Sequence, residues 1–280
     1  MVSKELTSLP SIKDCLARAE LPRLELRMLL EHVLERPRAW MLAHDDESLS
    51  SDQLYQFNCL LQKRLAGEPM AYLIGRRSFM EFELQVTPEV LIPRPETELL
   101  VEKSLALISD LKKPALLDLG TGSGAIAIAL SRVRPDASVT ATDASQGALY
   151  VAKGNARRLG VQITFCYGNW FDALERGQLF DLIVSNPPYI HQDDEHLLKG
   201  DLRFEPAVAL TDGKDGLSAL DEIVTKAPMW LKTGGSLWVE HGYDQGQSVR
   251  YLLRQAGFDD VRTDPDLAGL DRISGGVWRR

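Results

Sequence analysis

Cysteine is scarce in this sequence. Cys15, Cys59 and Cys166 are the three cysteines among 280 residues, and they lie too far apart to form a Cys-x-x-Cys pair. The five histidines do not cluster either. This spacing argues against a disulfide framework and against a metal site, so we expect no bound metal and a reducing, cytoplasmic environment.

Long apolar runs and an excess of basic residues are also missing. No apolar run approaches the roughly 20 residues needed to cross a bilayer, and residues 1–6 contain no apolar signal core. We therefore expect neither a membrane anchor nor export.

The formal net charge is −8, from 32 Lys and Arg against 40 Asp and Glu. Proteins that grip nucleic acid usually carry a basic patch, so direct binding of nucleic acid is not expected.

The first part of the chain is predicted to be helical. Apolar residues recur at helical spacing over residues 22–34, and the residues 50–52 are placed to cap a second long helix that ends at Gly67. Period-two alternation over residues 79–86 then indicates a strand pair. We therefore expect a helical bundle over residues 1–75, a hairpin linker over residues 76–95 and a larger domain over residues 96–280.

Strands and helices alternate along the larger domain. This alternation is typical of an α/β fold in which a mostly parallel sheet is covered by helices on both faces. We expect the helices at residues 99–111, 126–132, 217–231 and 247–256, and the strands at residues 115–118, 138–142, 163–167, 180–184, 236–240, 260–262 and 273–278.

A glycine-rich turn follows the first strand of this domain. Gly120, Gly122 and Gly124 alternate with other residues, which is not the spacing of the dinucleotide fingerprint. Asp143 ends the next strand and is placed to accept hydrogen bonds from ribose hydroxyls. The carboxylate of Asp118 would repel phosphates but attract the ammonium and sulfonium groups of S-adenosyl-L-methionine. The turn therefore predicts a site for that methyl donor.

The segment Asn186 to Tyr189, Asn-Pro-Pro-Tyr, ends the fourth strand. Each proline fixes its own φ and restricts the residue before it, so the Asn186 amide oxygen and the Pro187 carbonyl form a rigid acceptor pair for a substrate NH2 group. Tyr189 offers a flat surface to a planar group, and Trp170 is placed to stack on an adenine ring. A simple turn after a strand is the plainer interpretation of this segment.

Taken together, these motifs resemble those of class I S-adenosylmethionine-dependent methyltransferases that act on nitrogen. The segment Leu91 to Glu98, Leu-Ile-Pro-Arg-Pro-Glu-Thr-Glu, and the preceding helices narrow the resemblance to the HemK/PrmC family over nearly the whole chain. That family methylates the side-chain amide nitrogen (N5) of the glutamine in the Gly-Gly-Gln loop of class-1 peptide chain release factors.

The resemblance implies a Rossmann-like, seven-stranded sheet. It also implies that the N-terminal domain recognises the substrate and that the enzyme is a monomer. Asn186 to Tyr189 would hold the glutamine, with Asn186, Pro187 and Tyr189 as catalytic residues and Pro188 as a further substrate contact. Asn169 departs from the aspartate that relatives often carry there, although its carbonyl can still accept a bond. The residues implied to contact the cofactor are Asp118, Gly120, Thr121, Gly122, Ser123, Gly124, Asp143, Trp170 and Asn186.

Two other interpretations remain open at this point. An adenine-N6 methyltransferase acting on nucleic acid would use the same Asn-Pro-Pro-Tyr segment. A nucleoside-binding module without catalytic activity would bind S-adenosylmethionine and transfer no methyl group.

Overall fold

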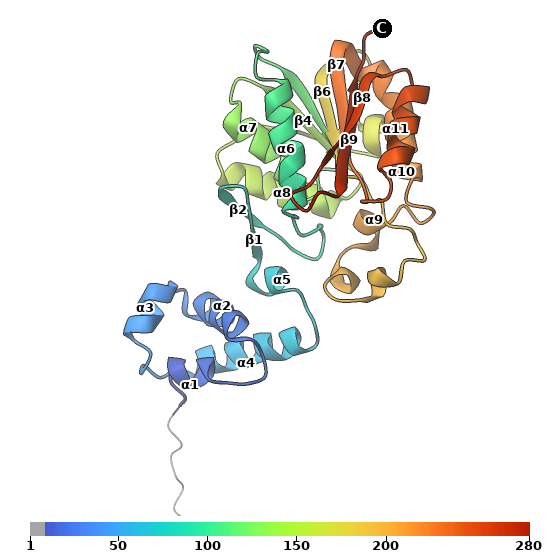
Figure 1. Ribbon diagram of the computed structural model, residues 1–280. Helices are drawn as coiled ribbons and strands as arrows, with labels where there is room; N and C mark the ends of the chain where they lie inside the picture. The colour runs from blue at the N-terminus through green and yellow to red at the C-terminus, as the bar shows by residue number, and fades with distance from the viewer. Residues whose placement is uncertain (1–8) are drawn as a thin grey trace, which may run out of the picture. The chain divides into compact units, whose positions relative to one another are not determined.

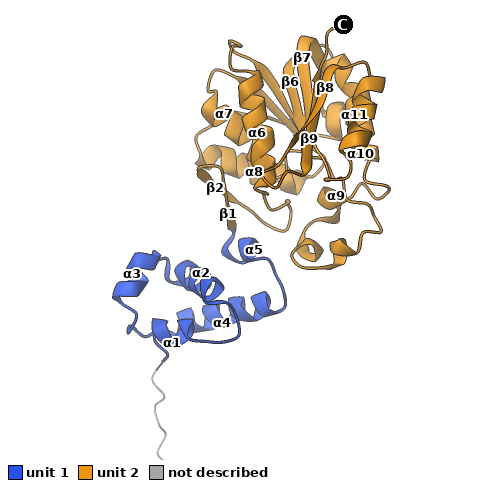
Figure 2. Ribbon diagram, in the orientation of Figure 1, with its two compact units in different colours: residues 1–75 blue, residues 76–280 orange. Residues whose placement is uncertain are grey.

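The computed structural model describes residues 9–280, so the expectation about a signal core in residues 1–6 lies outside the described part. The chain divides into two compact units, residues 1–75 and residues 76–280 (Figure 2). No helix within residues 9–280 has the length and apolar character that crossing a bilayer requires.

The first unit is a bundle of helices around one apolar core. Its helices are α1 (Ile12–Leu16), α2 (Arg23–Leu34), α3 (Arg38–Ala43), α4 (Ser51–Leu65) and α5 (Met70–Ile74). Helices α2 and α4 confirm the two helices predicted from the periodicity, and they bury Leu26, Leu29, Phe57 and Leu61 against each other. Ser50 begins α4 with a reciprocal capping box to Gln53, which satisfies backbone donors of the first turn.

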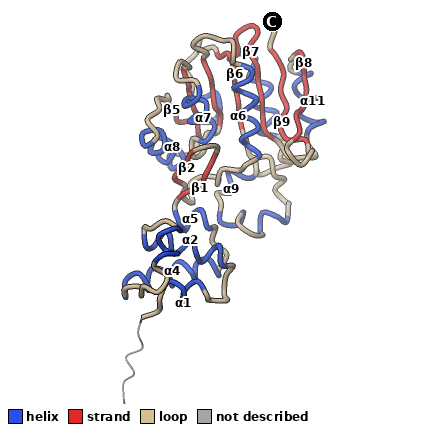
Figure 3. Tube along the Cα trace, turned by 60° about the vertical axis from the view of Figure 1, so that its left-hand side comes forward, coloured by secondary structure: helices blue, strands red, loops and turns tan. Residues whose placement is uncertain are grey.

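The second unit opens with a hairpin and continues as a seven-stranded sheet. The hairpin pairs β1 (Arg76–Phe79) with β2 (Phe82–Gln85). The sheet has the order β5-β4-β3-β6-β7-β9-β8, with antiparallel pairing only where β9 meets its neighbours. Its strands are β3 (Ala115–Leu119), β4 (Ser138–Asp143), β5 (Thr164–Tyr167), β6 (Phe180–Ser185), β7 (Leu231–Glu240), β8 (Asp259–Pro265) and β9 (Asp271–Val277). Figure 3 shows β6, β7 and β9 side by side. The predicted mostly parallel α/β fold is confirmed.

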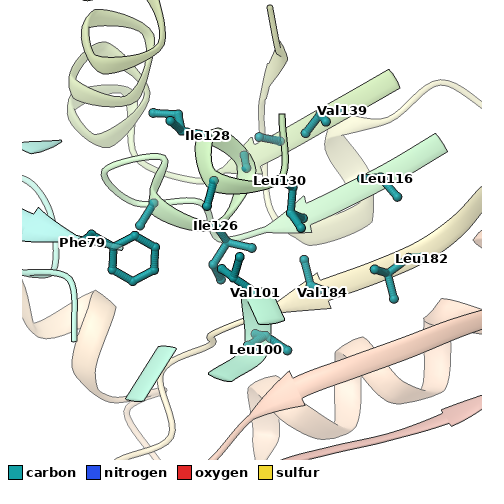
Figure 4. Packing of buried hydrophobic residues seen from close by; sticks show 14 of the residues in the cluster. Phe79, Leu100, Val101, Leu116, Ile126, Ile128, Leu130, Val139, Leu182 and Val184 are labelled. Carbon is teal, nitrogen blue, oxygen red and sulfur yellow. The ribbon is translucent and has the colours of Figure 1, made fainter. Parts of the chain in front are cut away.

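Helices cover both faces of this sheet, as Figure 1 shows. Alternate strand residues enter different cores. Leu116 and Val184 pack with α6 (Glu96–Leu107) and α7 (Ala125–Val133), whereas Leu117 and Ile183 pack with α10 (Ser218–Lys226) and α11 (Gly246–Gln255). Figure 4 shows the first of these cores, in which Leu100 of α6 belongs with Val184 of β6. The helices of this unit are α6 (Glu96–Leu107), α7 (Ala125–Val133), α8 (Gln146–Arg158), α9 (Ala207–Leu210), α10 (Ser218–Lys226) and α11 (Gly246–Gln255), with short 3-10 helices η1 (Trp170–Ala173), η2 (Glu195–Leu198), η3 (Leu202–Phe204) and η4 (Ala227–Trp230).

Two predicted helices end in different places from those expected. The helix expected over residues 99–111 occupies Glu96–Leu107. The helix expected over residues 217–231 ends at Lys226, because Pro228 lacks an N–H and the chain continues as the 3-10 turn η4. Strand β7 then begins at Leu231, earlier than expected, and the register of its pairing with β6 shifts between Leu231 and Ser236, where Gly234 and Gly235 lie.

Asn155 of α8 ties the hairpin to the glycine-rich turn. Its Oδ1 accepts from the Gln85 N–H at 2.7 Å, and its Nδ2 donates to the carbonyls of Gln85 at 2.9 Å and Ser123 at 3.0 Å. The side chain is fully buried, so water has no access to replace these bonds.

Replacing Asn155 with Ala should lower the free energy of unfolding by about 2–3 kcal/mol, because the backbone groups of Gln85 and the buried carbonyl of Ser123 lose their partner. Urea denaturation of the full chain measures this loss. The matched control is Gln162→Ala, which removes an amide from an exposed position and should change stability by less than about 0.5 kcal/mol. Equal stability of the two variants would show that the Asn155 tie does not stabilise the fold.

Candidate active site

A cavity of about 560 Å³ lies where the parallel strands end. This volume is within the range of roughly 300–1,000 Å³ that small-molecule sites usually have. The carboxyl ends of β3, β4 and β6 bring residues distant in the chain to this one edge, as is usual for open parallel sheets. The predicted site residues that line the cavity are Gly120, Thr121, Gly122, Ser123, Asp143, Trp170, Asn186 and Pro188.

The glycine-rich turn forms one wall of the cavity. Gly120 has φ +70°, and a Cβ added there would lie 3.0 Å from the Trp170 ring. Gly122 has φ +56° and would meet nothing within 4 Å, so its backbone borders open space. The left-handed conformation at both positions favours glycine. The turn therefore leaves room for a ligand to approach the main chain closely at Gly122.

Asp143 is held by the same turn. Its Oδ2 accepts from the Gly122 N–H at 2.8 Å, and its Oδ1 accepts from the Ser145 N–H at 2.8 Å. Burial raises the pKa of Asp143, and these two backbone bonds act against that rise. Each carboxylate oxygen keeps lone-pair capacity for a further donor. Asp143 can therefore accept bonds from vicinal hydroxyls in the cavity.

Asp118 lies behind the turn and is fully buried. Its Oδ2 accepts from the Thr121 hydroxyl at 2.6 Å and from the Ala127 N–H at 3.2 Å, whereas its Oδ1 has no partner among the described residues. Burial raises the pKa of Asp118 to about 7. An unpartnered acceptor beneath the turn favours a cationic ligand group over a phosphate.

Trp170 forms another wall. Its backbone has φ +43°, a left-handed conformation that bulky residues rarely adopt. Strained backbone of this kind often occurs at functional sites. The indole lines the cavity beside Gly120, and the exposed Asn169 lines it as well. A flat ring of this kind can receive a planar ligand group.

The Asn-Pro-Pro-Tyr segment is held by a chain of hydrogen bonds that leads to the buried carboxylate of Glu240. Asn186 donates from Nδ2 to the Thr97 hydroxyl at 3.1 Å, and that hydroxyl donates to Oε2 of Glu240 at 2.8 Å. The Tyr189 hydroxyl donates to Oε1 of the same carboxylate at 3.2 Å. Burial raises the pKa of Tyr189, so this hydroxyl stays protonated.

Not every predicted site residue reaches the cavity. Among residues 9–280, Asp118, Gly124, Pro187 and Tyr189 do not belong to its lining. The Tyr189 ring packs against the core formed with α10 and α11, and its hydroxyl is occupied by Glu240. That the Tyr189 ring offers a flat surface to a planar substrate group therefore stays a prediction.

The segment from residue 190 to residue 216 supplies a further wall. Pro206, Ala209 and Lys214 line the cavity. The buried carboxylate of Glu205 anchors this segment, because it pairs with Arg94 and accepts from the Ile92 N–H at 3.0 Å. The proline-rich stretch of residues 91–98 thus holds the wall in place as well as leading into α6.

Thr97 and Glu240 are functional candidates that the sequence analysis did not identify. A signal for Glu240 was nevertheless available. It ends β7, which pairs directly with the strand that precedes Asn186, and polar residues at adjacent strand ends meet at one edge of a parallel sheet.

Comparisons with known proteins agree with this geometry. The family model of the PrmC N-terminal domain matches residues 9–75, and that of the methyltransferase small domain matches residues 97–203. Among solved structures, a methyltransferase from Pyrococcus furiosus has a TM-score of 0.55 at 17% identity and covers 82% of this chain and all of its own. A 16S rRNA methyltransferase from T. thermophilus has a TM-score of 0.54 at 19% identity over 73% of this chain and 50% of its own. At such identities these two structures bear on the fold alone.

Curated relatives are much more similar. The release factor glutamine methyltransferase of Bordetella pertussis is 55% identical over 265 residues, which are 95% of this chain and 98% of the relative. The protein of the same name from Burkholderia pseudomallei is 48% identical over 94% of each chain. This similarity confirms the resemblance found in the motifs, and the chain belongs to the release factor glutamine methyltransferase family.

Proposed function

We propose that this protein methylates the side-chain amide nitrogen (N5) of the glutamine in the Gly-Gly-Gln motif of class-1 peptide chain release factors. S-adenosyl-L-methionine, when bound, supplies the activated methyl group. The observation that carries the proposal is the position of Asn186, which lines the cavity directly after β6 with its NH2 group already engaged by Thr97. Its amide oxygen is therefore the group left to accept a bond from the substrate amide.

The cavity lining suits S-adenosylmethionine. Asp143 would accept from the ribose hydroxyls, and Trp170 would face the adenine ring, with Asn169 beside it. Asp118 lies behind this lining, and in its ionised form it would favour the cationic end of the molecule, since one of its oxygens lacks a partner among the described residues. The open backbone of Gly122 leaves room for close approach.

The protein's own residues would act by positioning and by electrostatics. An amide nitrogen is a weak nucleophile because its lone pair is delocalised into the carbonyl. Two acceptors, Oδ1 of Asn186 and the carbonyl oxygen of Pro187, would hold the two N–H bonds of the glutamine and stabilise positive charge that develops on its nitrogen. The two prolines fix the direction of these acceptors before the substrate arrives. This arrangement requires no general base before methyl transfer.

We further propose that the unit of residues 1–75 recognises the release factor, and that the enzyme works as a cytoplasmic monomer without binding nucleic acid directly. The acidic balance, with a net charge of −8, supports the last point. The adenine-N6 alternative would use the same acceptor pair, but the names of the curated relatives do not favour it.

The test is methyl transfer from labelled S-adenosylmethionine to a purified release factor. We expect label on the wild-type factor and none on a factor whose Gly-Gly-Gln glutamine is changed to alanine. DNA and RNA serve as parallel substrates, and we expect them to stay unlabelled. Label on nucleic acid in place of the release factor would overturn the proposed substrate.

A further inference from the structure

Thr97 is shared between Asn186 and Glu240. Its hydroxyl accepts from Nδ2 of Asn186 and donates to Oε2 of Glu240. Thr97 lies in the first turn of α6, where the helix end has no side-chain cap. The hydroxyl thus serves the active site rather than the helix end. The hydroxyl carries a single proton. If Thr97 donates that proton to one neighbour, it can only accept a hydrogen bond from the other.

Glu240 decides the direction of these bonds. Its carboxylate is buried, and its two oxygens face the hydroxyls of Thr97 and Tyr189. Burial raises the pKa of Glu240 to about 7, and the charge of Glu96 adds to that rise, while the Thr97 bond, the charge of Arg272 and the Tyr189 bond act against it. The ionised carboxylate, which predominates above that pKa, only accepts. The Thr97 proton then points to Glu240 and a Thr97 lone pair faces Asn186, as the 2.8 Å and 3.1 Å bonds require.

This direction determines how the Asn186 amide is oriented. Its oxygen and its NH2 group are almost identical in shape, so hydrogen bonds, rather than packing, distinguish the two orientations. A lone pair on Thr97 accepts a bond from the NH2 group of Asn186. Because the amide is planar, Oδ1 then points away from Thr97. The reversed amide would present N–H groups to the N–H groups of a substrate glutamine, and donor would face donor.

We propose that Thr97 and Glu240 are positioning residues that fix the orientation of the Asn186 amide, so that its oxygen is presented to the substrate. The inference rests on the proposed function, in which that oxygen holds the glutamine NH2 group. Glu240 also binds the Tyr189 hydroxyl. One buried carboxylate therefore holds both ends of the segment from Asn186 to Tyr189, with the two stiff prolines between them.

The test compares Thr97→Val with Thr97→Ser. Valine keeps the shape of threonine but neither donates nor accepts, whereas serine keeps the hydroxyl. We expect Thr97→Val to lower kcat by about 10- to 100-fold, because a misplaced acceptor loses much of its positioning effect. Calorimetric affinity for S-adenosylmethionine and KM for the release factor should stay within about twofold of wild type, and Thr97→Ser should retain most of the activity. Equal kcat in the two variants would overturn the inference.

A double-mutant comparison separates positioning from a general structural role. If Thr97 acts through Asn186, adding Thr97→Val to Asn186→Ala should reduce the residual kcat no further. The same fold-change in kcat in both backgrounds would contradict the inference.

Thermal denaturation reports whether each variant folds. Should Thr97→Val fail to fold, Glu240→Gln takes its place, since its new NH2 group can donate to Thr97 and permit the reversed amide; an unchanged kcat there would also count against the inference.

The outcomes for this inference and for the proposed function are distinct. If the wild-type enzyme leaves the release factor unlabelled, the proposed function is wrong. If the wild-type enzyme labels the factor and Thr97→Val is as active as Thr97→Ser, the proposed function stands and only the positioning role of Thr97 and Glu240 is wrong.

Discussion

Asn186→Ala should lower kcat for release factor methylation by about 100- to 1,000-fold, the usual effect of removing one preorganised group that stabilises developing charge. The variant loses the side-chain oxygen that would hold one glutamine N–H bond, and only the Pro187 carbonyl remains. Affinity for S-adenosylmethionine should change little, because the glycine-rich turn and Asp143 stay intact. Single-turnover kinetics with labelled S-adenosylmethionine measure the chemical step, and calorimetry measures binding.

The matched control is Gln178→Ala, which removes a side-chain amide at an exposed position outside the cavity lining. Its kcat should equal that of wild type. Asn186→Ala with normal turnover would disprove the acceptor role of Asn186. A loss of S-adenosylmethionine binding in step with kcat would instead assign Asn186 to the cofactor.

Asp143→Ala should have the largest effect on cofactor binding. The carboxylate orders the turn by accepting from the N–H groups of Gly122 and Ser145, and it would also accept from the ribose hydroxyls. Hydrogen bonds to charged groups contribute about 1.5–3 kcal/mol, so affinity for S-adenosylmethionine should fall by about 10- to 100-fold. Isothermal titration calorimetry gives the dissociation constant directly.

Asp110→Ala controls for the loss of one negative charge, since Asp110 is exposed in the turn that follows α6 and does not line the cavity. It should bind S-adenosylmethionine with wild-type affinity. If the two aspartate variants bind equally well, Asp143 does not hold the ribose. If Asp143→Ala binds weakly only because it is partly unfolded, circular dichroism of the same samples will show that.

The strand-end residues were predictable because they follow from the periodicity of the chain. The alternation of strands and helices predicted β3, β4 and β6, and the strands of a parallel sheet bring Asp143 and Asn186 to one edge. The glycine spacing likewise indicated where a ligand could approach the backbone. For these residues, local sequence decides both the element and the position within it.

The contacts that hold the site in place were not predictable in this way. Thr97 and Glu240 are 143 residues apart, and Ile92 and Glu205 are 113 residues apart. Side-chain pairs at such separations depend on how α6 and the segment of residues 190–216 pack, which no local pattern encodes. The left-handed backbone of Trp170 was equally hidden, because that conformation is expected of glycine or asparagine rather than of tryptophan.

The contact between Gly120 and Trp170 restricts how this protein can change over evolutionary time. A Cβ at position 120 would lie 3.0 Å from the indole, so a side chain there requires the Trp170 ring to move by a few tenths of an ångström. A smaller residue at position 170 would relieve this contact only, because the φ of +70° at Gly120 disfavours L-residues whatever space they have. We therefore expect glycine to persist at position 120 even where the residue at position 170 changes.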